Sequence, residues 1–325
     1  MSSPGSRPVV LATLGAACIS SSAVVMRLAG SSASMTALGR CAIALPVLAL
    51  LAWLERRRGA ARLTRRGRWL ARVSGLFLAA DLIVWSHSIA DIGAGLGTVI
   101  TNLQVVIVTL LAWAVLGERP RRSLLIALPV MLGGLALVGG LTGAGAYGAR
   151  PGLGVALGIG VAALYSVYIL MLRQATVHHA PAGGDAADGR PPVVESLFQA
   201  TLGATAGAAA LGLALRDFRL GPAWPALGWL VLLALTSQVL GWLLITTSMP
   251  RLPAWLVSAL LLIQPIGSVA LSAAVLDERP SLPQLGGVAL MLAGVLIAAA
   301  GRGRPAGPAA QVPDPAPDAV DAVTE

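Results

Sequence analysis

The sequence predicts an all-α integral membrane protein with ten transmembrane helices, arranged as two inverted five-helix repeats. Two observations support this fold class. Of the 325 residues, 56% are hydrophobic and only 11% are charged, which is too apolar for an ordinary soluble domain. The second observation is a sequence repeat that relates the two halves of the chain at an offset of 160 residues.

Apolar runs of about 20 residues alternate with short charged or Pro/Gly-rich breaks, and such a run is long enough to cross a hydrocarbon core of about 30 Å. The first run is longer than the apolar core of a cleavable signal peptide and contains Arg27, so we expect it to remain as the first helix. The ten expected helices cover 9–28, 36–54, 70–90, 94–116, 123–141, 153–172, 193–215, 227–249, 254–276 and 282–300.

The arginines predict the orientation of these helices. If the N-terminus is inside, 17 arginines fall on the cytoplasmic side and 5 on the outer side, with Arg40 left inside a helix. Cytoplasmic loops of membrane proteins carry the excess of basic residues. We therefore expect a multi-pass protein of the cytoplasmic (cell) membrane, with both termini in the cytoplasm.

The repeat is clearest where AVLGERP (114–120) reappears as AVLDERP (274–280). Without gaps, residues 88–134 and 248–294 share 15 of 47 positions, including Gln104 with Gln264. Five helices are an odd number, so the second copy enters the membrane from the opposite side. We expect repeats over 8–142 and 151–301, followed by a disordered cytoplasmic tail over 302–325 that is rich in Pro, Ala and Asp.

The composition also excludes several classes of protein. The net charge is +9 and all 23 basic residues are Arg, but no solvated basic domain exists to bind nucleic acid. Cys18 and Cys41 lie in apolar runs and have no metal-ligand spacing. The loop with His178, His179, Asp185 and Asp188 also lacks such spacing, so we expect a flexible connector, no metal and no cofactor. No GxSxG, HExxH or Walker A motif suggests an enzyme.

The sequence resembles the EamA-type transporters of the drug/metabolite transporter superfamily over about residues 9–300. The resemblance rests on Arg40, on the LGERP and LDERP motifs, on Gln264-Pro265, and on the Gly-rich runs that end in GGLALV and AGVLIA. One departure is Val105, which stands where the fourth helix of the family commonly has proline.

The resemblance implies a secondary active transporter that exports a small organic metabolite, amino-acid-like or drug-like, by alternating access between the two halves. Its partners are then the small-molecule substrate, the lipid bilayer and, as a candidate coupling ion, the proton. A lipid or lipid-linked carrier and a facilitated-diffusion permease are the alternatives. A channel is disfavoured because the chain carries its own inverted repeat. Nothing in the sequence specifies an oligomeric state.

Ionisable side chains inside the bilayer cost about 2.5 to 3.5 kcal/mol, so each of them needs a role. Arg40 has two interpretations: it anchors a substrate carboxylate or phosphate, or it forms a structural ion pair with Asp81. Asp81 and Trp85 share one face of the third helix, and His87 and Asp91 share a neighbouring face. Asp81 and His87 are the candidates for proton coupling, since histidine titrates near neutral pH.

Neutral and aromatic groups complete the predicted substrate site. Amides at comparable depths in the two halves either hold the substrate or join helices to one another. Deep aromatic rings either form a wall for an organic substrate or pack in the core. The complete predicted site is Arg40, Asp81, Trp85, His87, Asn102, Gln104, Tyr165, Gln238, Trp242 and Gln264. The Glu-Arg-Pro turns are expected to close helices, with their charges at the membrane interface.

Overall fold

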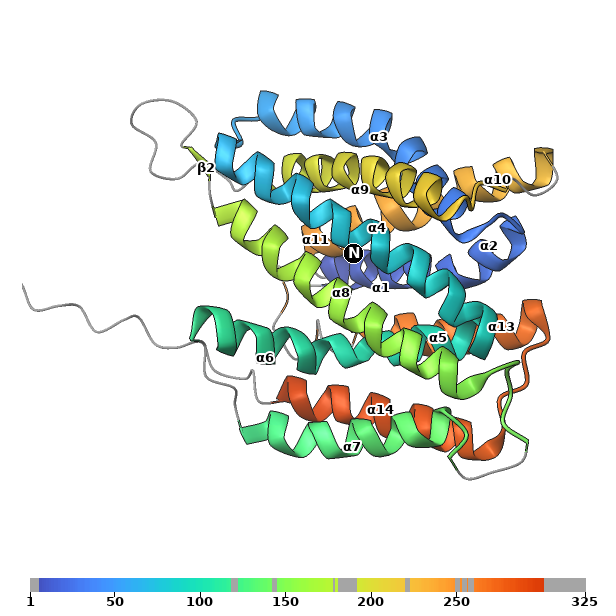
Figure 1. Ribbon diagram of the computed structural model, residues 1–325. Coiled ribbons are helices and arrows are strands. Elements are labelled where there is room, and N and C mark those ends of the chain that lie inside the picture. The colour runs from blue at the N-terminus through green and yellow to red at the C-terminus, as the bar shows by residue number, and fades with distance from the viewer. Residues whose placement is uncertain are drawn as a thin grey trace, which may run out of the picture.

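The computed structural model describes residues 6–117, 122–141, 145–177, 179–180, 192–219, 223–248, 252, 256 and 260–300. The predicted tail and most of the His178 loop lie outside these residues. The described chain forms a bundle of helices that run side by side (Figure 1). The first half contains α1 (Ser6–Ser20), α2 (Ser22–Ala29), α3 (Ala33–Arg57), β1 (Arg62–Leu63), α4 (Arg65–Ile92), α5 (Ala94–Ile100), η1 (Thr101–Leu103), α6 (Gln104–Leu116) and α7 (Arg122–Val138).

The second half repeats this pattern of long and interrupted helices. It contains α8 (Pro151–Val177), β2 (His179–Ala180), α9 (Val193–Leu215), α10 (Ala223–Leu233), the π-helical segment η2 (Ala234–Gly241), α11 (Trp242–Ser248), α13 (Ile263–Leu276) and α14 (Leu282–Ala300).

Among the described residues, eight helical segments are long and apolar enough to cross a membrane. Two further apolar helices, α7 with 17 residues and α13 with 14, are shorter. They correspond to the fifth and ninth of the ten runs expected from the sequence. The chain is therefore a predominantly helical, multi-pass membrane protein, with eight candidate spans among the described residues.

Local sequence explains where several helices begin and end. The Ser32 hydroxyl accepts a hydrogen bond from the Met35 amide at the start of α3, and Thr64 does the same for Gly67 at the start of α4. At the end of α6, Gly117 adopts φ 71°, a left-handed conformation that glycine reaches without strain.

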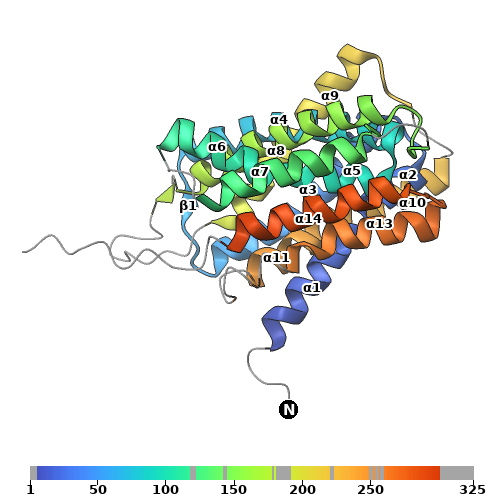
Figure 2. The ribbon, with the colours of Figure 1, turned by 90° about the horizontal axis from the view of Figure 1, so that it is seen from below.

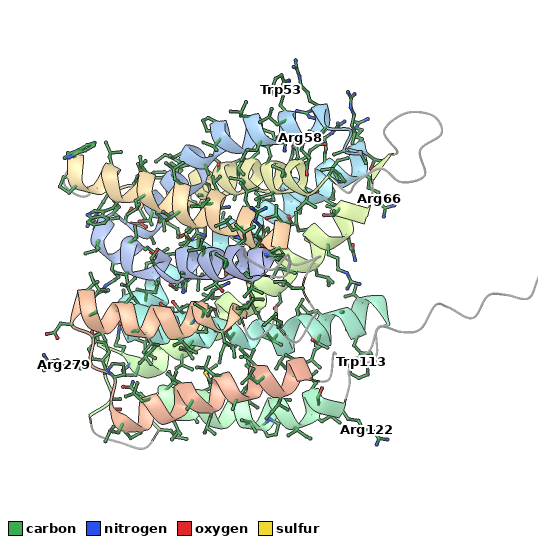
Figure 3. All side chains as sticks on the ribbon, turned by 180° about the vertical axis from the view of Figure 1, so that it is seen from behind. Trp53, Arg58, Arg66, Trp113, Arg122 and Arg279 are labelled. Carbon is green, nitrogen blue, oxygen red and sulfur yellow. The ribbon has the colours of Figure 1, made fainter. Side chains whose placement is uncertain are left out.

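The two ends of the bundle are distinct. At one end β1 pairs with β2 in a short antiparallel ribbon, in which Leu63 lies opposite His179; we call this the ribbon end. Figure 3 places Trp53, Arg58, Arg66, Trp113 and Arg122 at this end and Arg279 at the opposite one, which we call the Glu278 end. Figure 2 shows α1 projecting from one side of the bundle.

Helices of the two halves contact each other in reciprocal pairs. The Glu55 carboxylate at the end of α3 accepts hydrogen bonds from the Val194 and Glu195 amides at the start of α9, both at 2.9 Å. In return, Asp217, just beyond α9, accepts one from the Ser34 amide at the start of α3, at 3.2 Å. Each helix thus satisfies backbone donors at the start of the other.

The α7–α14 pair, at the bottom of Figure 1, shows the same reciprocity. A Cβ added at Gly134 of α7 would lie 2.8 Å from Met291 Cγ in α14, and one added at Gly294 of α14 would meet Met131 Cγ in α7. Gly134 and Gly294 occupy equivalent positions in the sequence repeat, as do Met131 and Met291. Each glycine therefore makes room for the methionine of the opposite helix.

Candidate functional site

A cavity of about 290 Å³ lies in the interior of the bundle and is lined by both halves of the chain. The first half contributes α1, α2, α3, α4 and the α5–η1–α6 segment, and the second half contributes α8, η2, α11, α13 and α14. Its polar and aromatic lining residues are Ser22, Arg40, Asp81, Trp85, Thr98, Thr101, Asn102, Gln104, Tyr165, Tyr168, Gln238, Trp242 and Gln264.

Arg40 enters the cavity from α3 and is only 7% exposed. Its Nε donates a hydrogen bond to Gln238 Oε1 of η2, at 3.0 Å. The Gln238 amide nitrogen in turn donates to Thr201 Oγ1 of α9, at 3.4 Å. Gln238 lies in the π-helical segment η2, and π-helical turns are frequent at functional sites. Gln238 therefore orients the guanidinium and leaves its terminal nitrogens for other acceptors.

Asp81 and Trp85 enter from α4, one turn apart, and both are buried. Asp81 Oδ1, Trp85 Nε1 and Gln104 Oε1 have no hydrogen-bond partner in the described protein. Buried polar atoms are rarely left unpaired, because desolvation costs free energy that only a partner recovers. The three residues that carry these unpartnered atoms all line the same cavity.

Arg40 and Asp81 do not form an ion pair. Within the described ranges, ion pairs join Arg150 to Asp91 at 2.9 Å and Arg279 to Asp277 at 3.0 Å, and neither involves the cavity. The structural ion pair considered for Arg40 is thus not present in this conformation. The cavity instead holds a cation and a carboxyl group on facing helices, each able to contact a different part of one ligand.

Aromatic rings form the apolar part of the lining. The rings of Tyr165 and Tyr168 on α8 lie 5.5 Å apart and are tilted by 50°. Trp85 and Trp242 contribute further aromatic surface from α4 and α11. Such surface favours organic groups and, through the ring faces, organic cations.

The helix that carries Asn102 and Gln104 changes its winding inside the bundle. Thr101 to Leu103 form a 3₁₀ turn between α5 and α6, and the Asn102 amide donates to the Thr98 and Val99 carbonyls at 3.2 and 3.1 Å. This side chain therefore stabilises its own helix. Gln104, one residue beyond the 3₁₀ turn, lines the cavity, and its Oε1 has no hydrogen-bond partner in the described protein.

Of the ten residues predicted for the site, nine line the cavity, and His87 does not. His87 lies on an exposed face of α4, two residues from Trp85 but turned away from the bundle interior. Thr98, Thr101, Ser22 and Tyr168 line the cavity but were not predicted as site residues. Tyr168 follows Tyr165 at a spacing of three, which places both on one helix face and was the available signal.

The second Glu-Arg-Pro turn lies away from the cavity. Glu278 of the second Glu-Arg-Pro turn was expected at the membrane interface, but it is buried, with 2% of its surface exposed. Glu118 of the first turn lies outside the described residues. The part of the chain that is described contains no cluster of three or more His, Cys, Asp or Glu side chains suited to a metal ion.

Comparison with known proteins identifies the family. The sequence profile of the EamA-like transporter family matches residues 6–140 and again residues 152–300. No curated protein matched the chain. One similar solved structure is a protein crystal structure with 17% identity and a TM-score of 0.58, and the match covers 90% of this chain and 97% of that one. That likeness concerns the fold, whereas the profile covers most of the sequence, twice. The chain therefore belongs to the EamA-like transporter family.

Proposed function

We propose that this membrane transporter moves a small organic solute, amino-acid-like or drug-like, and holds it in the cavity between Arg40 and Asp81. The observation that carries the proposal is the lining itself. Arg40, which is buried, and Asp81 and Trp85, each with an unpartnered polar atom, line one cavity beside two tyrosine rings. Such a lining suits a solute with an acidic group, a cationic or hydrogen-bonding group and an organic body.

We further propose that ten spans form two inverted repeats, which alternate access to the cavity. The reciprocal α3–α9 and α7–α14 contacts support this arrangement, because a two-fold axis relating the halves exchanges the members of each pair. Inverted repeats give two related conformations, with the binding site between the halves. The change between them then exposes the cavity first at one end and then at the other.

Proton coupling is proposed for Asp81 rather than His87. Asp81 faces the cavity and leaves one oxygen unpartnered, whereas His87 lies outside the cavity. Only a group in contact with the solute path can exchange a proton for the solute. Asp81 then releases its proton before the solute binds, and Arg40 holds the solute once it is bound.

The ribbon end is proposed as the cytoplasmic end of a protein in the cell membrane. Arg58, Arg66 and Arg122 gather there, as expected for cytoplasmic loops (Figure 3). Labelling of a cysteine at position 185 or 310 by an impermeant reagent in intact cells would contradict this orientation.

Comparative metabolite profiling of cells with and without the protein is the first test, followed by uptake of the enriched compound into proteoliposomes. We expect saturable movement of a water-soluble solute, driven by a pH gradient and lost in Arg40→Gln. Movement of labelled lipids alone would identify a lipid carrier. A rate that ignores both the pH gradient and a protonophore would identify facilitated diffusion.

A further inference from the structure

A seam between α5 and α13 separates the cavity from the Glu278 end. Thr98 lines the cavity, and its hydroxyl is hydrogen-bonded to the Ser268 hydroxyl at 3.0 Å. One turn further, a Cβ added at Gly95 would lie 2.5 Å from Ser272 Oγ. The two backbones are therefore in close contact from the cavity outward, and α5 and α13 belong to different halves of the chain.

Glu278 completes the seam at its outer edge. Its Oε1 accepts a hydrogen bond from the Ala94 amide at 2.7 Å, and its Oε2 accepts one from the Gly95 amide at 3.1 Å. Gly93 permits this approach, because a Cβ at that position would lie 2.9 Å from Glu278 Oε2. Gly93 also adopts φ 97°, so the α4–α5 turn is built around a residue without a side chain.

The surroundings of Glu278 set this contact apart from an ordinary surface ion pair. The preceding residue, Asp277, also carries a carboxylate, but it is 80% exposed and pairs with Arg279. Among the described residues, Glu278 instead bonds to backbone amides, in a buried position beside Tyr147. Burial raises the pKa of the Tyr147 phenol, and the neighbouring Glu278 carboxylate raises it further. A buried carboxylate that accepts two amide hydrogen bonds, one of them short, is held strongly.

We infer that Glu278 is a latch that holds the Glu278 end of the cavity closed in this conformation. The inference rests on the proposed transport function. For the cavity to open at the Glu278 end, α5 and α13 must separate along the seam, and Glu278 must then release the Ala94 and Gly95 amides. The latch therefore sets the balance between the two conformations without contacting the solute.

The distance between α4 and α13 tests the latch independently of transport. Spin labels are attached to cysteines introduced at Ala90 and Val275, both exposed, in a background with Cys18→Ala and Cys41→Ala. Distances are measured by pulsed electron paramagnetic resonance in the reconstituted full-length protein. Glu278→Gln removes the charge and one acceptor, so we expect the balance between closed and open ends to shift by roughly tenfold toward longer distances.

A second variant removes the other partner of the same bond. Ala94→Pro deletes the amide that donates to Glu278 Oε1, and proline is tolerated at the first position of a helix. We expect the same shift as in Glu278→Gln, and no shift in the adjacent control Asp277→Asn. An unchanged distance distribution in either folded latch variant overturns the inference, as does an equal shift in the control. If Glu278→Gln fails to fold, Ala94→Pro decides the question.

The two claims fail separately. If no solute is transported in proteoliposomes but both latch variants lengthen the distance, the latch stands and the proposed function falls. If the wild type transports a solute and the distances do not change, the function stands and the latch falls.

Discussion

Replacing Gly134 by alanine should destabilise the protein, although alanine is the better helix former. In α7, a Cβ at this position would lie 2.6 Å from the Gly287 carbonyl oxygen and 3.0 Å from the Met291 amide nitrogen, both in α14. These are backbone atoms, so only a displacement of one helix relieves the clash. Overpacking of this kind costs about 1 to 3 kcal/mol, against about 1 kcal/mol gained from helix propensity.

The neighbouring residue provides the matched control. Gly133 is exposed, and a Cβ there would meet nothing within 4 Å. Gly133→Ala should therefore stabilise the protein by up to about 1 kcal/mol through propensity alone. In α14, Gly286 and Gly287 form a second pair of the same kind, with Gly286 open and Gly287 in contact with α7.

Unfolding of the purified variants in mixed detergent micelles measures these differences. We expect Gly134→Ala and Gly287→Ala to unfold at a lower denaturant concentration than Gly133→Ala and Gly286→Ala. If Gly134→Ala is as stable as Gly133→Ala, then α7 and α14 do not pack through these glycines, and the reciprocal Met–Gly contact is wrong.

Three further predictions concern the site and the helix ends. Arg40→Lys keeps the charge, but a single ammonium group cannot both bond Gln238 and offer two nitrogens to a ligand. Solute affinity, measured by equilibrium binding, should therefore fall about 10- to 100-fold. An unchanged affinity would place the solute elsewhere. Glu55→Gln weakens the bonds to the start of α9 and should lower the unfolding free energy by about 1 kcal/mol, whereas Arg58→Gln on the exposed surface should leave it unchanged. Asp81→Asn should abolish the response of transport to a pH gradient but keep slow exchange down a solute gradient; retention of the gradient response would exclude Asp81 as the proton carrier.

Much of the cavity could be predicted from the sequence, because polar residues inside apolar helices are costly and therefore face one another. Arg40, Asp81 and Gln238 were found by this reasoning. His87 failed the same test because helix periodicity gives the faces of α4 but not which face meets the interior. The structure turns Trp85 inward and His87 outward, although they are two residues apart.

The fold was predictable in outline from the apolar runs and the repeat, but its internal contacts were not. The π-helical turn at Gln238 and the 3₁₀ turn at Asn102 have no simple signature in the sequence, since tertiary packing determines them. Glu278 was assigned to the surface because Glu-Arg-Pro normally closes a helix at the membrane interface. Its burial depends on the Gly93 turn, which lies 185 residues earlier in the chain.

Solute protection of a cysteine at position 264 tests the central claim most directly. Gln264→Cys places a thiol in the cavity in a background free of Cys18 and Cys41, and Asp277→Cys places one on the exposed surface. A small thiol reagent is added with and without the solute identified by metabolite profiling. We predict that the solute slows labelling at position 264, with half-protection near its transport KM, and leaves position 277 unaffected. Equal labelling of position 264 at saturating solute, in a variant that still transports, would show that the solute does not occupy this cavity.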